Sequence, residues 1–363
     1  IYTLSLHDAL PISIYVVKPE VPGEVKAGGN VMLKAVKDVI LDHSVTAGTL
    51  NLENGTFTGG GEIDLVSTKG RILQNADGGL VAGSVTATSG KGVTLTDEGN
   101  TFREFTAYGV DTEVTDAQGN KVTEKVIDGS VNVRTHAGSM LAAGIEGTVV
   151  YGDVALANLD DGGLTVDTDI VTKKGNHGEA GNITFSQQGD ILVSPNVALQ
   201  AGGSVFAASS DGAVSVLGTV VAARDLDVKT GRGKLRMYGD VHAGNDILTA
   251  TESGYIEMDN GVAAQHDIVA TSRNGNIGLM GDIYAGNDVN AQTGGDGRIL
   301  FNLNFITGRH EVHAGHDVNL TIDNSVIMIA GKITTDTGDI RATARTGGMI
   351  FTGSIQAGQD IIA

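Results

Sequence analysis

Ala243-Gly244-Asn245-Asp246-Ile247 is a five-residue cassette that returns at a near-constant interval through the second half of the chain. Its fourth residue, an acidic or small polar anchor, recurs every 21 or 22 residues, with a single step of 29. Repeats of this length, none of which can bury its own apolar face, are typical of a solenoid. The anchors are Ser204, Asp225, Asp246, Asp267, Asp288, Asp317, Asp339 and Asp360.

Each repeat contains three short segments in which apolar residues alternate with variable ones. The residue after each anchor is aliphatic in every repeat, and the residue two positions later is small or apolar in all but one. This period of two predicts a cassette strand with one face turned inward. A second strand begins about ten residues later, and a third strand precedes the next cassette. The predicted inward column of the cassette strands is Val205, Leu226, Ile247, Ile268, Val289, Val318, Ile340 and Ile361. That of the second strands is Val214, Leu235, Ile256, Ile277, Ile299, Ile327 and Ile350, with another inward column two residues later that ends at Thr352. That of the third strands is Val220, Val241, Val262, Ile283, Val312, Ile333 and Ile355.

Three short strands per coil of about 21 residues, joined by Gly-rich corners, predict an all-β fold, a right-handed parallel β-helix. Like residues then stack about 4.8 Å apart along the axis. Leucine-rich repeats have a similar period, but their leucine ladder is absent, and calcium-binding nonapeptide rolls need tandem motifs of which residues 294–297 are a lone near match. The 29-residue step predicts a coil with a longer loop, formed by residues 294–297 and 305–309.

The repeat pattern covers the chain unevenly. Residues 1–12 match, codon by codon, the translation of a common sequencing adapter, so we interpret them as non-native, and residues 13–26 as a lead-in segment. Residues 27–363 are expected to form the β-helical shaft, with early cassettes before Val31 and Val85. The pattern blurs between residues 100 and 172, where Gly119 indicates the turn of a projecting β-hairpin. We expect the chain to be an internal fragment of a longer protein.

The composition argues against several classes of protein. A formal charge of −19 over 363 residues opposes binding to nucleic acid, which requires a basic surface. The chain has no cysteine, which excludes a disulfide scaffold and thiol chemistry. It has no apolar run of about 18 residues, so no membrane-spanning segment is expected.

The anchor column offers two interpretations. Stacked carboxylates about 4.8 Å apart repel one another, and calcium ions would relieve that repulsion. The pattern also places Asn30, Ser84, Asn182 and Ser204 in this column, and these residues carry no charge but share a short side-chain oxygen. Because such an oxygen can accept a hydrogen bond from nearby backbone N–H groups, we favour corner capping over a metal.

Two further groups of polar residues are candidates for a site. His310, His313 and His316 are spaced by three, but on an extended chain such residues point to opposite faces, which favours polar ladders over a metal cluster. The acidic pairs Asp160-Asp161 and Asp167/Asp169 have the chemistry of glycoside hydrolysis, yet a solvated surface is the ordinary interpretation in so acidic a chain. No nucleophile elbow, P-loop or Cys/His metal motif is present. The sequence therefore predicts no catalytic residue, no cofactor and no metal.

The cassette Ala-Gly-x-Asp-Ile/Val, the aliphatic alternation and the phrase Gly181-Asn182-Ile183-Thr184 resemble the filamentous haemagglutinin family of large bacterial exoproteins and adhesins. The resemblance covers residues 27–363 and is clearest over 181–363. It implies a secreted shaft on the bacterial cell surface, exported by an outer-membrane transporter of the two-partner type. The implied partners are a receptor or glycan on a host cell or another bacterium.

The leading hypothesis is a non-catalytic shaft of a filamentous adhesin that mediates cell adhesion. The stalk of a contact-dependent toxin is an alternative with the same architecture. A β-helical polysaccharide lyase or hydrolase is a rival from another class. Such an enzyme needs acidic and basic residues converging on one outward strand face, and here the outward columns vary from coil to coil.

Overall fold

The computed structural model describes residues 24–50, 57–116, 118–301 and 310–363. All regular secondary structure within these ranges is β-strand, so the all-β prediction is confirmed. None of these residues belongs to a helix that could cross a membrane. The chain divides into two compact units, Ile1–Gln187 and Gln188–Ala363. The segment interpreted as non-native, residues 1–12, and residues 13–23 of the lead-in lie outside the described residues.

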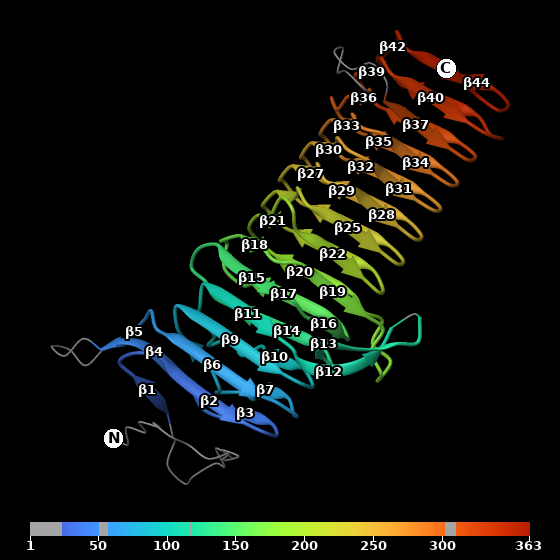
Figure 1. The fold of residues 1–363 in the computed structure, drawn as a ribbon. Helices are drawn as coiled ribbons and strands as arrows, with labels where there is room; N and C mark the ends of the chain where they lie inside the picture. The colour runs from blue at the N-terminus through green and yellow to red at the C-terminus, as the bar shows by residue number, and fades with distance from the viewer. Residues whose placement is uncertain (1–23, 51–56, 117, 302–309) are drawn as a thin grey trace. The chain divides into compact units, whose positions relative to one another are not determined.

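The second unit consists of coils that each contribute one parallel strand to three sheets (Figure 1). Along the chain, a second strand is followed by a third strand and then by a cassette strand. The cassette strands are β23 (Val205–Ser209), β26 (Leu226–Thr230), β29 (Ile247–Thr251), β32 (Ile268–Ser272), β35 (Val289–Thr293), β38 (Val318–Ile322), β41 (Ile340–Ala344) and β44 (Ile361–Ile362); the second strands are β21 (Ile191–Val193), β24 (Val214–Val216), β27 (Leu235–Met237), β30 (Ile256–Met258), β33 (Ile277–Leu279), β36 (Ile299–Phe301), β39 (Val326–Ile329) and β42 (Gly348–Phe351); the third strands are β22 (Ala198–Ala201), β25 (Thr219–Ala222), β28 (Val241–Ala243), β31 (Val262–Ala264), β34 (Ile283–Ala285), β37 (Glu311–Ala314), β40 (Lys332–Thr335) and β43 (Ser354–Gln356).

The core of this unit consists of aliphatic files that run from coil to coil. Ile247 pairs with Ile268, and Ile268 pairs with Val289, and these side chains are at most 1% exposed. Ile256 and Ile277 are paired and fully buried in the second strands. Successive coils are therefore in register, as the 21-residue period predicted, and the parallel β-helix with three strands per coil is confirmed.

One part of the predicted register is wrong. Ile350 and Thr352 were expected inside the last described coil, but Met349 pairs with Ile327 and Phe351 with Ile329. Met349 follows Ala344 by five residues, the same distance that separates Thr251 from Ile256 in an earlier coil. The constant length of the corner therefore decides the register, although Ile350 is more hydrophobic than Met349. A shift of one residue exchanges the inward and outward faces of a strand, so Ile350 faces outward.

The long coil has its extra residues in two places. The corner between β35 and β36 holds residues 294–298, one residue more than the corner between β32 and β33. Gly295 lies in this corner with a φ of +54°, a conformation that glycine adopts without steric cost. The rest of the insertion falls between β36 and β37, and its predicted part, residues 305–309, lies outside the described residues.

The first unit is also a stack of parallel coils, but its third strand changes place. In the first coils the third strand comes after the strand of the sheet that contains β3, as β4 comes after β3. In later coils it comes before the strand of that sheet, as β16 comes before β17. This change shifts the phase of the pattern and explains why the sequence blurs after residue 100. The three kinds of strand are β2 (Val31–Ala35), β6 (Glu62–Ser67), β9 (Ser84–Ser89), β11 (Glu104–Tyr108), β15 (Leu141–Ile145) and β18 (Leu164–Val166); β3 (Val39–Leu41), β7 (Ile72–Gln74), β10 (Val93–Leu95), β14 (Val131–Thr135), β17 (Val154–Asn158) and β20 (Ile183–Gln187); and the third strands β1 (Val25–Ala27), β4 (Val45–Leu50) and β8 (Leu80–Val81), with β5 (Phe57–Gly59) antiparallel to β4, and later β13 (Lys121–Ile127), β16 (Val149–Tyr151) and β19 (Ile170–Lys173).

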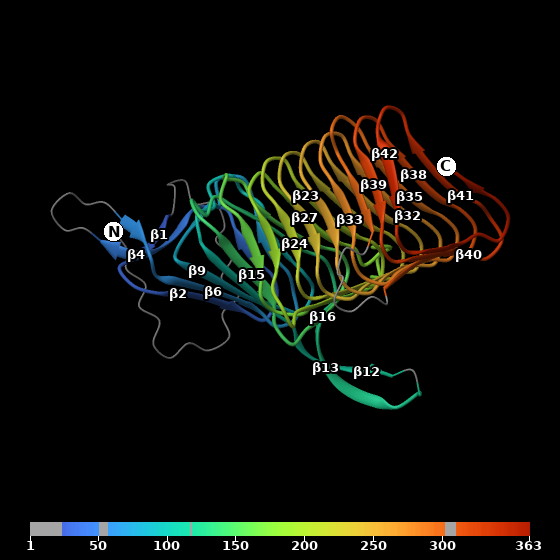
Figure 2. The same ribbon diagram turned by 90° about the horizontal axis from the view of Figure 1, so that it is seen from above.

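A hairpin leaves the coils of the first unit. Strand β12 (Val110–Thr115) pairs antiparallel with β13, and the pair extends away from the coils of this unit (Figure 2). Gly119 lies in the turn with a φ of +86° and donates to the carbonyl of Asp116 at 3.0 Å. The Asp116 side chain accepts the backbone N–H groups of Gln118 and Asn120, which fixes the turn.

The single anchor column expected for Asn30, Ser84 and Asn182 is wrong. Asn30 and Ser84 stand at the start of β2 and β9, two strands of one sheet, whereas Asn182 precedes β20, which pairs with β17 in another sheet. The move of the third strand is the physical reason, because it changes which sheet a cassette leads into.

Candidate functional site

The acidic anchors of the second unit form a hydrogen-bonded ladder between coils. The carboxylate of each anchor accepts the backbone N–H of the anchor one coil later, as Asp246 does from Asp267 at 3.1 Å. The capping bond assigned from the sequence is therefore present, but its donor lies in the next coil and not in the same corner. The other donor–acceptor pairs are Asp246 to Asp225 at 3.5 Å, Asp288 to Asp267 at 3.1 Å, Asp317 to Asp288 at 2.9 Å, Asp339 to Asp317 at 2.8 Å and Asp360 to Asp339 at 2.9 Å.

Side chains beside the anchors supply further donors. The Asn245 amide donates to Asp225 at 2.6 Å, and the Asn287 amide donates to Asp267 at 2.7 Å. The Asn245 bond is the largest cause that lowers the pKa of Asp225, against the opposing effect of partial burial. An amide donor from the next coil therefore stabilises the ionised carboxylate of Asp225.

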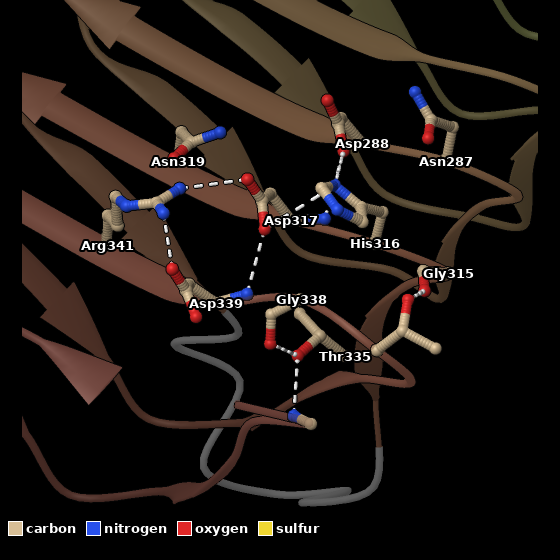
Figure 3. Close-up of polar contacts among 12 residues, drawn as sticks. Asn287, Asp288, Gly315, His316, Asp317, Asn319, Thr335, Gly338, Asp339 and Arg341 are labelled. Atoms are coloured by element: carbon tan, nitrogen blue, oxygen red, sulfur yellow. Dashed lines mark hydrogen bonds and ion pairs between the residues drawn. The ribbon is translucent and has the colours of Figure 1, made fainter. Parts of the chain in front are cut away.

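One group on this ladder has the composition of a metal site. His316 Nδ1 lies 3.1 Å from Asp288 Oδ1 and 3.5 Å from Asp317 Oδ1, so the imidazole is between the two carboxylates (Figure 3). One ligand atom from each of the three residues lies within 4.8 Å of the others. Carboxylate oxygen and imidazole nitrogen are ligands that suit several divalent cations.

The carboxylates of this group already have partners within the protein. Arg341 donates to Asp317 Oδ2 at 2.8 Å and also contacts Asp339 (Figure 3). Burial favours protonated Asp317, but the Asp339 amide and the Arg341 guanidinium outweigh it and hold the pKa of Asp317 below its ordinary value. The carboxylates at this point are thus occupied by backbone N–H groups, an arginine and a histidine.

The other two histidines of the predicted trio have separate partners. His310 Nδ1 lies 3.3 Å from Asp282, whereas His313 Nδ1 lies 2.9 Å from Thr334 Oγ1. His313 is in register with Tyr284 of the preceding coil, and the two rings are stacked. The three histidines therefore take part in ladders between coils, as the period-two argument predicted for them.

The acidic pairs are divided between different surroundings. Asp160 accepts the backbone N–H of Gly138 at 2.6 Å, and its other oxygen is 2.7 Å from His136 Nδ1. The bond to His136 is the main reason why the pKa of Asp160 is lowered. An ionised carboxylate with these partners is a poor general acid for glycoside hydrolysis. The other three candidate acids, Asp161, Asp167 and Asp169, are exposed.

A buried column of hydroxyl groups was missed from the sequence. It stands five residues after each of the first five anchors, inside the corner that ends the cassette strand. Ser272 is typical, since it donates to the carbonyl of Gly254 at 3.2 Å and accepts the N–H of Gly275 at 2.7 Å. The signal is a Ser or Thr followed three or four residues later by Gly. The column comprises Ser209, Thr230, Thr251, Ser272 and Thr293, none of them more than 5% exposed.

No match to the chain was found among protein-family models, curated proteins or solved structures. Function is therefore inferred from the fold and from the contacts described above. Most of these contacts join a residue of one coil to a residue of the next, as in the ladder of anchors. Their direct chemical consequence is to hold a stack of coils in register.

Proposed function

We propose that the chain is a non-catalytic structural shaft of a secreted filamentous adhesin of the haemagglutinin-like type, displayed on the bacterial cell surface. The shaft displays the surface that binds a receptor or glycan at a distance from the cell. It is exported by an outer-membrane transporter of the two-partner type. The observation that supports this proposal is the unbroken register of the second unit, where each coil is paired with the next in all three sheets.

The outward residues support a shaft over an enzyme. The outward second positions of successive cassette strands change from coil to coil and include Phe206, Asp227 and Val269. A lyase or hydrolase would require acids and bases converging in a groove of fixed composition. The acidic group around Asp317 is instead bonded to Arg341 and to backbone N–H groups.

Adhesion by the purified chain tests the proposal. Beads coated with the chain are incubated with a panel of bacterial and animal cells, and attachment is compared with beads coated with the Ile277→Asp variant, in which the stack is broken. We expect several-fold more attachment by the intact chain to at least one cell type. Equal attachment by both coatings across the panel would contradict the adhesin function.

A second measurement addresses catalysis directly. The chain is incubated with neutral and acidic polysaccharides, and new reducing ends and unsaturated sugar products are measured over time. We expect no product above that formed with the Ile277→Asp variant. Steady release of either product by the intact chain would replace the shaft with the enzyme.

A further inference from the structure

The third strands of the second unit carry a column of outward residues with a gap in it. Val221, His242, Ala263, Tyr284 and His313 are in register on β25, β28, β31, β34 and β37, which lie side by side (Figure 1). Coils are about 4.8 Å apart, so the backbone positions of His242 and Tyr284 are about 9.6 Å apart along the axis, with only the Ala263 methyl group between them. The result is a slot one coil wide.

The orientation of the Tyr284 ring makes one face of it a wall of this slot. The ring is 51% exposed and stacks on His313 with a centroid distance of 5.0 Å and an angle of 9°. Because this stacking runs along the column, the opposite face of the Tyr284 ring is turned toward Ala263. The phenol is thus held by His313 from behind and open to solvent in front.

The rim of the slot carries the polar groups of His242 and Gln265 and has no lysine or arginine. The hollow is lined on this face by His242, Ala263 and Tyr284, and at the corner by Gly244, Gln265 and Gly286. The two glycines have no side chain to close the corner, and the exposed Gln265 amide offers both donors and an acceptor.

A carboxylate reaches the other end of the slot. Gly261 precedes β31, and Asp240 Oδ1 lies 3.3 Å from the point where a Cβ on Gly261 would be. The carboxylate of Asp240 therefore lies over Gly261, two residues before Ala263 on the outward side of the strand. A carboxylate at this end of the slot disfavours an anionic ligand and can accept hydrogen bonds from hydroxyl groups.

We propose that this slot binds a neutral hexopyranose, one ring of a glycan. The Tyr284 face packs against the C–H groups of the sugar, while Gln265, His242 and Asp240 bond to its hydroxyl groups. A flat aromatic ring can contact both walls only if they are about 7–8 Å apart, which is twice the usual carbon–carbon contact distance. The slot is about 9.6 Å wide between strands. The thicker chair of a saturated sugar therefore fills it better than a flat ring does. The proposal rests on the adhesin function proposed above, because it names the ligand that such a surface contacts.

Binding to the full chain is measured by saturation-transfer NMR and by titration with the methyl glycosides of glucose, galactose and mannose. We expect saturable binding of at least one of them. Tyr284→Ala should weaken that binding at least tenfold, and Tyr284→Phe less than threefold. Ala263→Leu, which fills the slot, should also weaken it at least tenfold. The matched controls are Phe206→Ala, which removes another exposed aromatic ring, and Ala250→Leu, on the outward face of β29; both should bind as the native chain does.

Thermal unfolding of each variant shows whether its coils remain stacked. The proposal is overturned if none of the three glycosides binds, if Tyr284→Ala binds as well as the native chain, or if glucuronate, phenol or choline binds more tightly than every neutral sugar. The bead assay separates this failure from that of the adhesin function. If beads coated with Tyr284→Ala still attach to cells, the adhesin function stands and the slot is not its binding site. If the native chain binds a sugar but its beads do not attach to any cell, the slot stands and the adhesin function is contradicted.

Discussion

The backbone N–H of Asp267 donates a hydrogen bond of 3.1 Å to Oδ1 of Asp246, which lies one coil earlier. What this position contributes is an acceptor oxygen, so Asp246→Asn should change the free energy of unfolding by no more than about 0.5 kcal/mol. Asp246→Ala leaves the Asp267 N–H without its partner and should cost about 1–2 kcal/mol. Urea unfolding of both variants, with and without a chelator, distinguishes capping from calcium. A large loss in Asp246→Asn, or a loss on chelation of the native chain, would support the metal.

The aliphatic files should not tolerate a charge. Ile277 is fully buried between Ile256 and Ile299, so Ile277→Asp places a carboxylate in a core with no partner for it. We expect a loss of at least about 4 kcal/mol and the disappearance of the cooperative transition in circular dichroism. Val269→Asp, at an outward position of β32, is the control and should melt close to the native chain. Similar melting of both variants would show that the inward and outward faces are misassigned.

Close approach of coils at a corner predicts a second sensitive position. A Cβ on Gly254 would lie 1.7 Å from the carbonyl oxygen of Gly233 in the preceding coil. Gly254→Ala should therefore push two coils apart and cost about 2 kcal/mol or more. Gly348 has nothing within 4 Å of the same point, so Gly348→Ala should stay within about 0.5 kcal/mol. Equal urea midpoints for the two variants would contradict the spacing of the coils at this corner.

The hydroxyl column gives a prediction about hydrogen bonding rather than shape. Ser272 is 1% exposed and accepts the Gly275 N–H, so Ser272→Ala leaves a partly buried donor without a partner. We expect a loss of about 1–3 kcal/mol in the free energy of unfolding. Ser272→Thr should retain most of the stability, because Thr251 and Thr293 occupy the same column in the adjacent coils. If Ala and Thr at this position are equally stable, the hydroxyl group is not required.

The sequence was sufficient for the architecture where the repeat is regular. A constant step between anchors and a period of two placed Ile247, Ile268 and Val289 in one internal file, and the structure has them paired and buried. Side-chain hydrophobicity predicted the wrong register for β42. Ile350 is more apolar than Met349, but the length of the corner decides which of them faces inward.

Contacts between coils were harder to predict than the coils themselves. The partner of an anchor is a backbone N–H some 21 residues away, and no local pattern shows that the oxygen reaches across. The grouping of Asp288 and His316 has the same cause, because the residues are 28 positions apart and meet through the stacking of β35 and β38. In the first unit, the order of the three strands within a coil changes, so a constant spacing between cassettes no longer identifies equivalent strands.

Acid should weaken the stack through carboxylates whose pKa is lowered by folding. The pKa of Asp317 lies below its ordinary value of 3.8, because the Asp339 amide and Arg341 outweigh the effect of burial. The stability that it contributes is therefore complete above about pH 5 and is lost as the pH falls below 4 toward the folded pKa. Asp225 and Asp160 shift in the same direction, whereas the pKa of the partly buried Asp64 is raised and opposes them. The free energy of unfolding, measured in urea, should fall steadily from pH 5 to pH 2.

Removal of Arg341 identifies how much of this fall belongs to the Asp317 pair. Arg341→Gln should be less stable than the native chain at pH 6, and the difference should shrink as the pH falls toward 2, because protonation of Asp317 removes the charge that Arg341 contacts. Arg345 is the control, since its Nε is 3.8 Å from Asp323 on an exposed corner and such a pair contributes little. Arg345→Gln should therefore match the native chain at both pH values. A deficit in Arg341→Gln that is the same at pH 6 and pH 2 would mean that Arg341 acts through packing and not through the charge of Asp317.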